Sequence, residues 1–368
     1  MRRFTIMLLC AALALLPAAA GAATLRVYTP FADMDAGAQG WEEIVRAWEA
    51  ETGNTCEDYS GLQDEQWMDA LRADLAAGKA DLVVLPVGSG FTESELVTAA
   101  ELEEAGAAGA RSLPAMAEKD GAVLLSPVRW GFETLYVNTD VLAAAGLQAP
   151  ESWEDLVVAC AVLSQMGTLP IANALTEWAE IVLDCAALIA APAEEFGAAA
   201  SLEGASGVLS SLVMVGGFGG DPWNAEDEQT AEAFLSGQAA MRFDSWDFAL
   251  SVPQERTEHV RVIALPGIEG GVRRSLPGEL GCGVTLSRAC RQDGEKWQAA
   301  LSLAGKLLSA ESAQALMLPA GGALAESMAE LTASTEAVCG VLYDKNPEGF
   351  DDWAEKAVSS LMTPEAQE

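Results

Sequence analysis

The stretch "ADLVVLPVGSG", residues 80–90, decides the fold, because it is a nearly all-apolar run that ends in glycines. Such a run is typical of a parallel strand that is buried on both faces of its sheet. Two strand–helix units precede it, with strands predicted at 24–31 and 55–59 and helices at 40–53 and 64–78. This βαβαβ order predicts an α/β protein whose parallel strands send the loops that follow them to one edge of the sheet.

The two helices are predicted from the spacing of their apolar side chains. In the first, Trp41, Ile44 and Trp48 share one helical face, and the run ends at Gly53. The second helix repeats this spacing and ends at Gly78. We therefore expect both helices to pack one face against the sheet.

Strand and helix patterns continue through the rest of the chain. Ser152 followed by Asp155 has the spacing of a capping box, directly before an apolar run. The glycine-rich stretch 215–223 lacks the strand-to-helix spacing of a nucleotide-binding loop, so we expect a flexible loop there. A second unit begins near 128–140, further strands are predicted at 239–244, 259–267 and 281–287, and further helices are predicted at 153–163, 176–190, 226–236, 294–309, 309–317 and 350–362.

Residues 1–22 have the features of a secretory signal peptide. Two arginines precede a short apolar run, and small residues in A-x-A spacing follow it, so cleavage is expected after Ala22, with Ala20 as the alternative. The apolar run is too short for a comfortable membrane span. Cys10 lies inside that run and makes a poor lipid-attachment site. We expect an exported, soluble protein of the periplasm or the extracellular space.

The charge of the chain excludes some partners. The formal net charge is −35, and it becomes −37 without the signal peptide, because 18 basic residues then remain against 55 acidic ones. A field of that sign repels nucleic acid and anionic lipid and attracts cations, while it leaves uncharged ligands unaffected. No nucleic-acid partner is expected.

The cysteines leave two interpretations open. An even number follows the signal peptide, which permits disulfides in an exported chain, and free buried thiols are the alternative. Cys160 and Cys185 could face each other from consecutive helical segments, and Cys282 and Cys290 flank one strand and turn. With His259 as the one histidine and no C-x-x-C motif, neither a metal site nor a cofactor is expected. The six are Cys56, Cys160, Cys185, Cys282, Cys290 and Cys339.

Four stretches, taken in order, carry a resemblance to a known family. They are "ETLYVNTDVLAAAGLQAPESWEDLVVACAVL" (133–163), "AFLSGQAAMRFDSW" (233–246), "VIALPGIEGG" with "GELGCGVTLS" (262–287) and "EKWQAALSLAGKLLSAESAQ" (295–314). Their order and spacing resemble the family-1 extracellular solute-binding proteins of ABC importers, the carbohydrate-type group to which maltose-binding proteins belong. The resemblance runs from about residue 25 to 330.

The resemblance implies a two-lobed periplasmic-binding-protein fold of type II. Each lobe would be a mostly parallel sheet flanked by helices, with a ligand cleft between the lobes. Lobe 1 would comprise 23–130 plus 265–318, and lobe 2 would comprise 131–264 plus 319–368. The implied function is a monomeric receptor that captures a sugar or oligosaccharide by hinge closure and delivers it to the transmembrane subunits of an ABC permease.

Ligands of open α/β sheets bind beyond the carboxyl ends of the strands, which points to residues in the loops there. An indole offers a flat apolar face to the C–H face of a sugar, and ionised carboxylates accept hydrogen bonds from its hydroxyls. Asp33 and Glu279 are the acids that we favour first. The candidate ligand-binding residues are Trp246, Trp223, Trp130, Asp33, Glu279, Phe31, Asp247, Glu133 and Asn173.

The other tryptophans are expected to have structural roles. Six lie on predicted helices or caps at apolar spacing, which favours core packing, whereas Trp178 begins a helix and fits either role. The six are Trp41, Trp48, Trp67, Trp153, Trp297 and Trp353.

Three alternative functions remain to be weighed. A cationic solute such as a polyamine would also suit tryptophan beside carboxylates, and the −37 field would speed its capture. A secreted carbohydrate-active enzyme could use two carboxylates, but the chain has no nucleophile elbow, no histidine relay and no metal motif, so we expect no enzyme and no catalytic residues. A purely adhesive surface protein is the third alternative.

Overall fold

The computed structural model describes residues 22–32, 35–86, 89–107, 115–116, 124–175, 180–192, 201–317 and 322–339. The predicted signal peptide up to residue 21 and the predicted helix at 350–362 lie outside the described residues, as do Asp33, Trp178 and Trp353. None of the described helices is both long and apolar enough to cross a lipid bilayer.

The predicted βαβαβ opening is confirmed. It consists of β1 (Thr24–Tyr28), α1 (Ala38–Thr52), β2 (Thr55–Asp58), α2 (Glu65–Ala76) and β3 (Leu82–Pro86), with β1 parallel to both β2 and β3. Gly53 ends α1 in the left-handed conformation, with φ of 74°, which glycine adopts without a steric penalty. Trp41, Ile44 and Trp48 are buried on one face of α1, as their spacing predicted.

The sheet of this first lobe is covered on both faces. On one face, Leu25, Val27 and Leu82 pack with the buried tryptophans of α1 and with apolar residues of α9 (Gly294–Leu307). On the other face, Tyr28 and Val83 pack with α2. The near-continuous apolar run of β3 follows from this burial on both sides.

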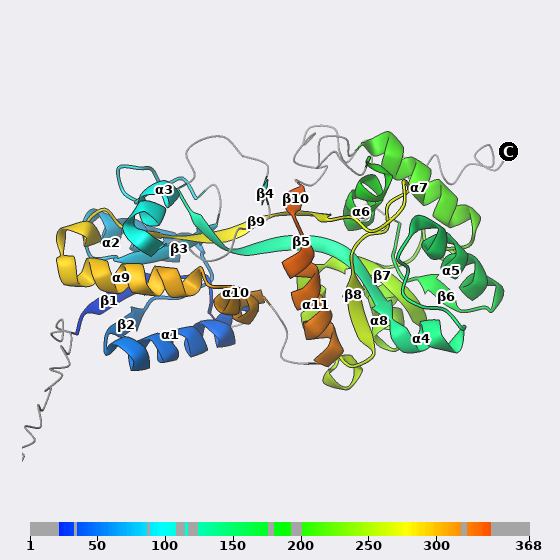
Figure 1. Cartoon of the computed structure of the whole chain (residues 1–368), viewed down its shortest axis with the longest axis horizontal. Coiled ribbons are helices and arrows are strands. Elements are labelled where there is room, and N and C mark those ends of the chain that lie inside the picture. The colour runs from blue at the N-terminus through cyan, green and yellow to red at the C-terminus, as the bar shows by residue number, and fades with distance from the viewer. Residues whose placement is uncertain are drawn as a thin grey trace, which may run out of the picture.

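Two long strands connect this lobe with a second one (Figure 1). They are β5 (Ser126–Asn138) and β9 (Ser275–Leu286), which pair antiparallel with each other, and β9 also pairs antiparallel with β3. The sheet is therefore mixed: β1 is parallel to β2 and β3, whereas β5 is antiparallel to β9 and β9 is antiparallel to β3.

The second lobe contains β6 (Leu169–Ile171), β7 (Ala239–Ser245) and β8 (Val260–Ile263). Strands β7 and β8 pair with opposite edges of β5, and β6 is parallel to β7. The helices of this lobe are α4 (Thr139–Ala144), α5 (Trp153–Gln165), α6 (Glu180–Ala190), α7 (Leu202–Met214) and α8 (Asp227–Leu235). Ser152 caps α5 by accepting a hydrogen bond from the Asp155 N–H, so the predicted cap is confirmed.

Nine further elements complete the described part of the fold. They are α3 (Ala99–Leu102), η1 (Glu103–Ala107), β4 (Ala115–Met116), η2 (Trp246–Ser251), η3 (Gln254–Arg256), η4 (Cys290–Gln292), α10 (Ala310–Met317), α11 (Gly322–Ser334) and β10 (Ala337–Cys339).

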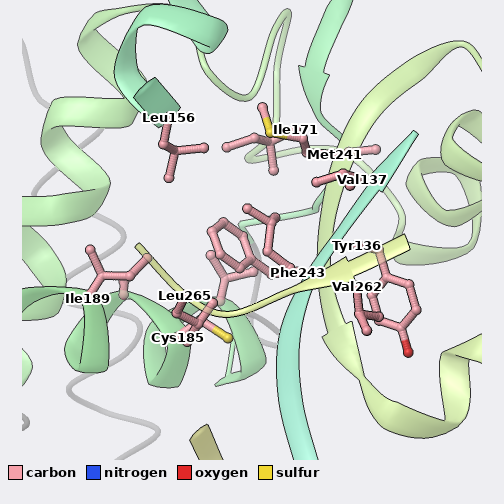
Figure 2. Packing of buried hydrophobic residues seen from close by; sticks show 14 of the residues in the cluster. Tyr136, Val137, Leu156, Ile171, Cys185, Ile189, Met241, Phe243, Val262 and Leu265 are labelled. Carbon is pink, nitrogen blue, oxygen red and sulfur yellow. The ribbon is translucent and has the colours of Figure 1, made fainter. Parts of the chain in front are cut away.

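The core of the second lobe is a single large cluster (Figure 2). Side chains from β5, β6, β7, α5 and α6 converge there, among them Tyr136, Ile171 and Phe243. Leu265 and Leu276 also belong to this cluster. Their contacts favour placing the second lobe boundary within β9 rather than before residue 265, and the boundaries themselves remain a prediction.

Candidate functional site

The directions of the strands determine which edges of the two lobes face each other. Strand β5 runs from the first lobe into the second, and β3 runs in the same direction, because both are antiparallel to β9. The carboxyl ends of β1, β2 and β3 therefore point toward the second lobe. Strands β7 and β8 are antiparallel to β5, and β6 follows β7, so their carboxyl ends point back toward the first lobe.

Trp246 stands at one of these facing edges. It directly follows the last residue of β7, and its indole is half-buried against the core of the second lobe. The Tyr136 hydroxyl donates to the carbonyl oxygens of Ser245 at 2.8 Å and of Trp246 at 3.1 Å. Burial raises the pKa of Tyr136 well above its ordinary value, so the phenol stays protonated and keeps donating. The backbone that carries the indole is thus fixed from β5.

A second group lies where the first lobe meets Trp246. The Arg129 guanidinium donates to both carboxylate oxygens of Asp35, at 2.6 and 3.0 Å. Its central carbon lies 5.1 Å from the centre of the Phe31 ring and 5.7 Å from the centre of the Trp246 ring. Arg129 therefore contacts a residue that follows β1 of the first lobe and a residue that follows β7 of the second.

Behind Trp246, a buried arginine joins three segments of the second lobe. Arg242 is 3 % exposed and donates to the carboxylates of Asp227 and Asp244 and to the Ala172 carbonyl oxygen. Burial raises the pKa of Asp244, although the Arg242 charge acts in the opposite direction. Asp244 in turn accepts from the Ser245 N–H at 2.8 Å, next to Trp246. No local pattern in the sequence indicated this pairing of Arg242 with Asp244 and Asp227.

Asn173 has a structural role in this arrangement. Its side chain donates to the Phe243 carbonyl oxygen and accepts from the Phe243 N–H, both at 2.9 Å, as a neighbouring strand would. Two residues later, the Leu175 N–H donates to the Pro222 carbonyl oxygen at 2.8 Å. These bonds bring the segment before Trp223 to the same edge of the sheet as β6 and β7.

The candidate residues other than Asn173 fall into three groups. Trp130 and Phe31 are 0 % and 2 % exposed, and the Trp130 ring packs 5.1 Å from that of Phe132, so burial favours a core role for both. Trp223, Trp246 and Glu133 are half-buried and Asp247 is exposed. Glu279 lies in β9 with its backbone opposite Gly131, while its side chain, like Asp33, lies outside the described part of the chain.

The described cysteines are free thiols, so for them the second interpretation, free thiols rather than disulfides, is confirmed. Neither a Cys160–Cys185 nor a Cys282–Cys290 disulfide is present. Burial raises the pKa of each of Cys160, Cys282 and Cys290 to about 12, so these thiols stay protonated and unreactive at neutral pH. They act as small apolar side chains.

Comparisons with known proteins agree with this architecture. Residues 32–314 match the family described as "Bacterial extracellular solute-binding protein". No curated protein sequence matches the chain.

Solved structures share the fold at low sequence identity. A probable secreted solute-binding lipoprotein from Streptomyces coelicolor is 16 % identical, with a TM-score of 0.68 over 93 % of this chain and 96 % of that one. The solute receptor AcbH, described as having an exclusive preference for β-D-galactopyranose, is 16 % identical, with a TM-score of 0.62 over 93 % and 95 %. A chitin oligosaccharide binding protein is 20 % identical, with a TM-score of 0.56 over 94 % and 96 %. The predicted two-lobed α/β fold is confirmed, and the chain belongs to the bacterial extracellular solute-binding proteins.

Proposed function

We propose that the chain is an exported receptor that captures a sugar or oligosaccharide and delivers it to the transmembrane subunits of an ABC importer. The observation that carries this proposal is the half-buried indole of Trp246, held by Tyr136 at an edge where the two lobes face each other. A sugar ring can bury its C–H face against an indole and leave its hydroxyls free for polar groups around it. Two of the structural neighbours, the chitin oligosaccharide binding protein and AcbH, are described as receptors for sugars.

The ligand would lie between the facing edges of the lobes. Trp223 lies in the second lobe beside the segment that follows β6. Asp247 follows Trp246 directly in the chain, and Glu133 lies opposite Ser245 in the sheet register, so both would provide carboxylates near the indole. Asp33 and Glu279 remain proposed ligands of the sugar hydroxyls. Trp130 contributes from the core, because its indole has no exposed surface.

Capture would use the two-lobed architecture directly. The long strands β5 and β9 connect the lobes and would act as the hinge, with lobe 1 proposed at 23–130 plus 265–318 and lobe 2 at 131–264 plus 319–368. A ligand that contacts both lobes stabilises the closed form by its differential affinity for that form. The receptor would act as a monomer in the periplasm or outside the cell, without catalysing a reaction.

The test is a titration of the mature protein, residues 23–368, with mono- and oligosaccharides and with spermidine and putrescine. We expect one sugar to raise the melting temperature and to bind in calorimetry, because a ligand at 100 times its Kd stabilises the native state by about 2.7 kcal/mol. The Trp246→Ala variant should lose about tenfold or more in affinity, since removing the indole removes much of the buried apolar area.

Trp297→Ala is the matched control for this variant. Trp297 is also half-buried, and an arginine, Arg291, lies 5.6 Å from its ring centre, but it follows β9 on the side away from the second lobe. Its loss should leave the affinity unchanged. A response to polyamines alone, weakening as salt rises, would contradict the sugar proposal and support the cationic alternative.

A further inference from the structure

Arg129 is the one cationic side chain, among the described residues, for which a contact within 6 Å of the Trp246 ring is found. We propose that Arg129 is a specificity-determining residue of the solute site, which donates hydrogen bonds to ligand oxygens beside Trp246 and excludes cationic solutes from that indole. This inference rests on the proposed function and narrows the substrate class to a neutral polyhydroxyl compound.

The guanidinium is fixed in place rather than free to swing away. Its side chain is 14 % exposed, and that of its partner Asp35 is 19 % exposed. Asp35 is itself held at the beginning of α1, where it accepts from the Gly37 N–H at 2.7 Å. The Phe31 ring, which packs on Trp41 of the core, lies against the guanidinium as well. A planar group held on this many sides is pre-organised, so little conformational entropy is lost when it binds.

Donors remain on the guanidinium after the ion pair is formed. A guanidinium has five N–H groups, and the bidentate pair with Asp35 uses one on each terminal nitrogen. A further contact with the buried Cys282 thiol still leaves N–H groups without a described acceptor. Oxygen atoms of a ligand that stacks on Trp246 would lie within reach of them, because the ring centre is 5.7 Å from the guanidinium carbon.

The same geometry acts against cations. An ammonium group stacking on Trp246 would have to approach a fixed positive charge that already contacts this indole. The overall charge of −37 would draw polyamines toward the protein, but the charged group described against the Trp246 ring itself is the guanidinium of Arg129, which is positive. The local arrangement therefore favours a sugar over a polyamine.

The experiment compares Arg129→Met with Arg291→Met in the mature protein. Arg291 is a matched control, because it also pairs with a carboxylate, Glu101 at 3.2 Å, and also lies over an indole, that of Trp297. In calorimetry with the sugar that the wild type binds, Arg129→Met should lose tenfold or more in affinity, and Arg291→Met should stay within twofold.

Spermidine provides the second readout. The wild type should not bind spermidine. Arg129→Met should bind spermidine, because the Asp35 carboxylate is left unpaired. The double variant Asp35→Asn/Arg129→Met should again not bind spermidine, while it still binds the sugar weakly. The double variant leaves no unpaired charge, so it keeps the test valid if Arg129→Met folds poorly. The melting temperatures of all variants show which of them are folded.

The outcomes separate the inference from the proposed function. If Arg129→Met binds the sugar within twofold of the wild type while Trp246→Ala loses it, the inference is overturned and the receptor function stands. If the wild type binds no sugar, the proposed function fails, and the spermidine readout alone decides about Arg129. Spermidine binding by the wild type, or no gain in Arg129→Met, would overturn the inference.

Discussion

At the scale of single residues, Trp130 and Trp246 show that neighbours decide the role of an indole. Both were predicted at strand ends facing the other lobe. Strand β5 continues to Asn138, so Trp130 lies inside it and alternates onto the same side as Phe132, in the core. Strand β7 ends at Ser245, so Trp246 leaves the sheet and stays half-buried. The length of each strand, rather than the local sequence, separates the two roles.

Glu101 is a residue whose contribution to stability should depend on pH. Hydrogen bonds from Arg288, and then from the Thr98 backbone, lower the pKa of Glu101 to about 2. A lowered pKa in the folded state means that the stabilisation is present above the ordinary value of 4.5 and is lost as pH falls toward 2. Glu101→Gln should therefore be less stable than the wild type at pH 7, and the difference should shrink between pH 4.5 and 2.

Urea unfolding midpoints at pH 7, 4.5, 3 and 2 measure this difference. Glu103→Gln is the control, since it removes one exposed charge from the neighbouring helical segment without breaking a described ion pair. If the difference in unfolding midpoint between the wild type and Glu101→Gln stays constant with pH, the ionised form of Glu101 does not stabilise the folded protein.

At the scale of elements, α7 and α11 are helices that the local sequence patterns did not predict, and α7 shows why. Its residues include Gly204, Gly207 and several serines, which have low helix propensity. It forms because Ala205, Val208 and Leu212 are buried in the core of the second lobe. A Cβ atom on Gly204 would lie 2.8 Å from the Ala190 Cβ of α6, so this glycine permits the close approach of the two helices.

This contact predicts opposite effects for two substitutions in one helix. A methyl group added at Gly207 would meet no atom of another element within 4 Å, so Gly207→Ala should stabilise the protein by up to about 1 kcal/mol through helix propensity. Gly204→Ala gains the same propensity but overpacks against α6, at a cost of about 1–3 kcal/mol. Denaturant unfolding of both variants checks the order, and equal stabilities would show that α6 and α7 adjust freely.

At the scale of the whole molecule, the crossing of β5 and β9 holds the lobes together. At Gly278 of β9, an added Cβ would lie 2.2 Å from the Gly131 carbonyl oxygen and 2.9 Å from the Phe132 Cα of β5. Both contacts are with backbone atoms, which cannot rotate away as a side chain could. A glycine is therefore required at this position of the connection.

Gly278→Ala should consequently weaken the connection between the lobes. We expect a loss of about 1–3 kcal/mol in the free energy of unfolding and an increase in the radius of gyration in X-ray scattering. Gly281→Ala is the control in the same strand, because its nearest contact would be 3.3 Å, to the Arg129 carbonyl oxygen. An unchanged radius of gyration together with an unchanged stability would contradict the requirement for glycine at 278.

The sequence by itself determined the elements whose signals are local. Apolar periodicity, caps and glycine stops located α1, α2, α5 and the strands around them, because these signals act over a few residues. The same patterns, in their order, resembled the family to which the chain belongs. They also indicated Trp246 at the end of a strand.

Only the tertiary structure decided which side chains meet. The ion pair of Arg129 with Asp35 joins residues 94 positions apart, and the Tyr136 hydroxyl reaches Trp246 across 110 positions. The burial of Trp130 and the formation of α7 likewise depend on packing against distant elements. Such contacts are set by strand register and lobe geometry, which no local pattern encodes, and for this reason the polar surroundings of the candidate site could not be derived from the sequence.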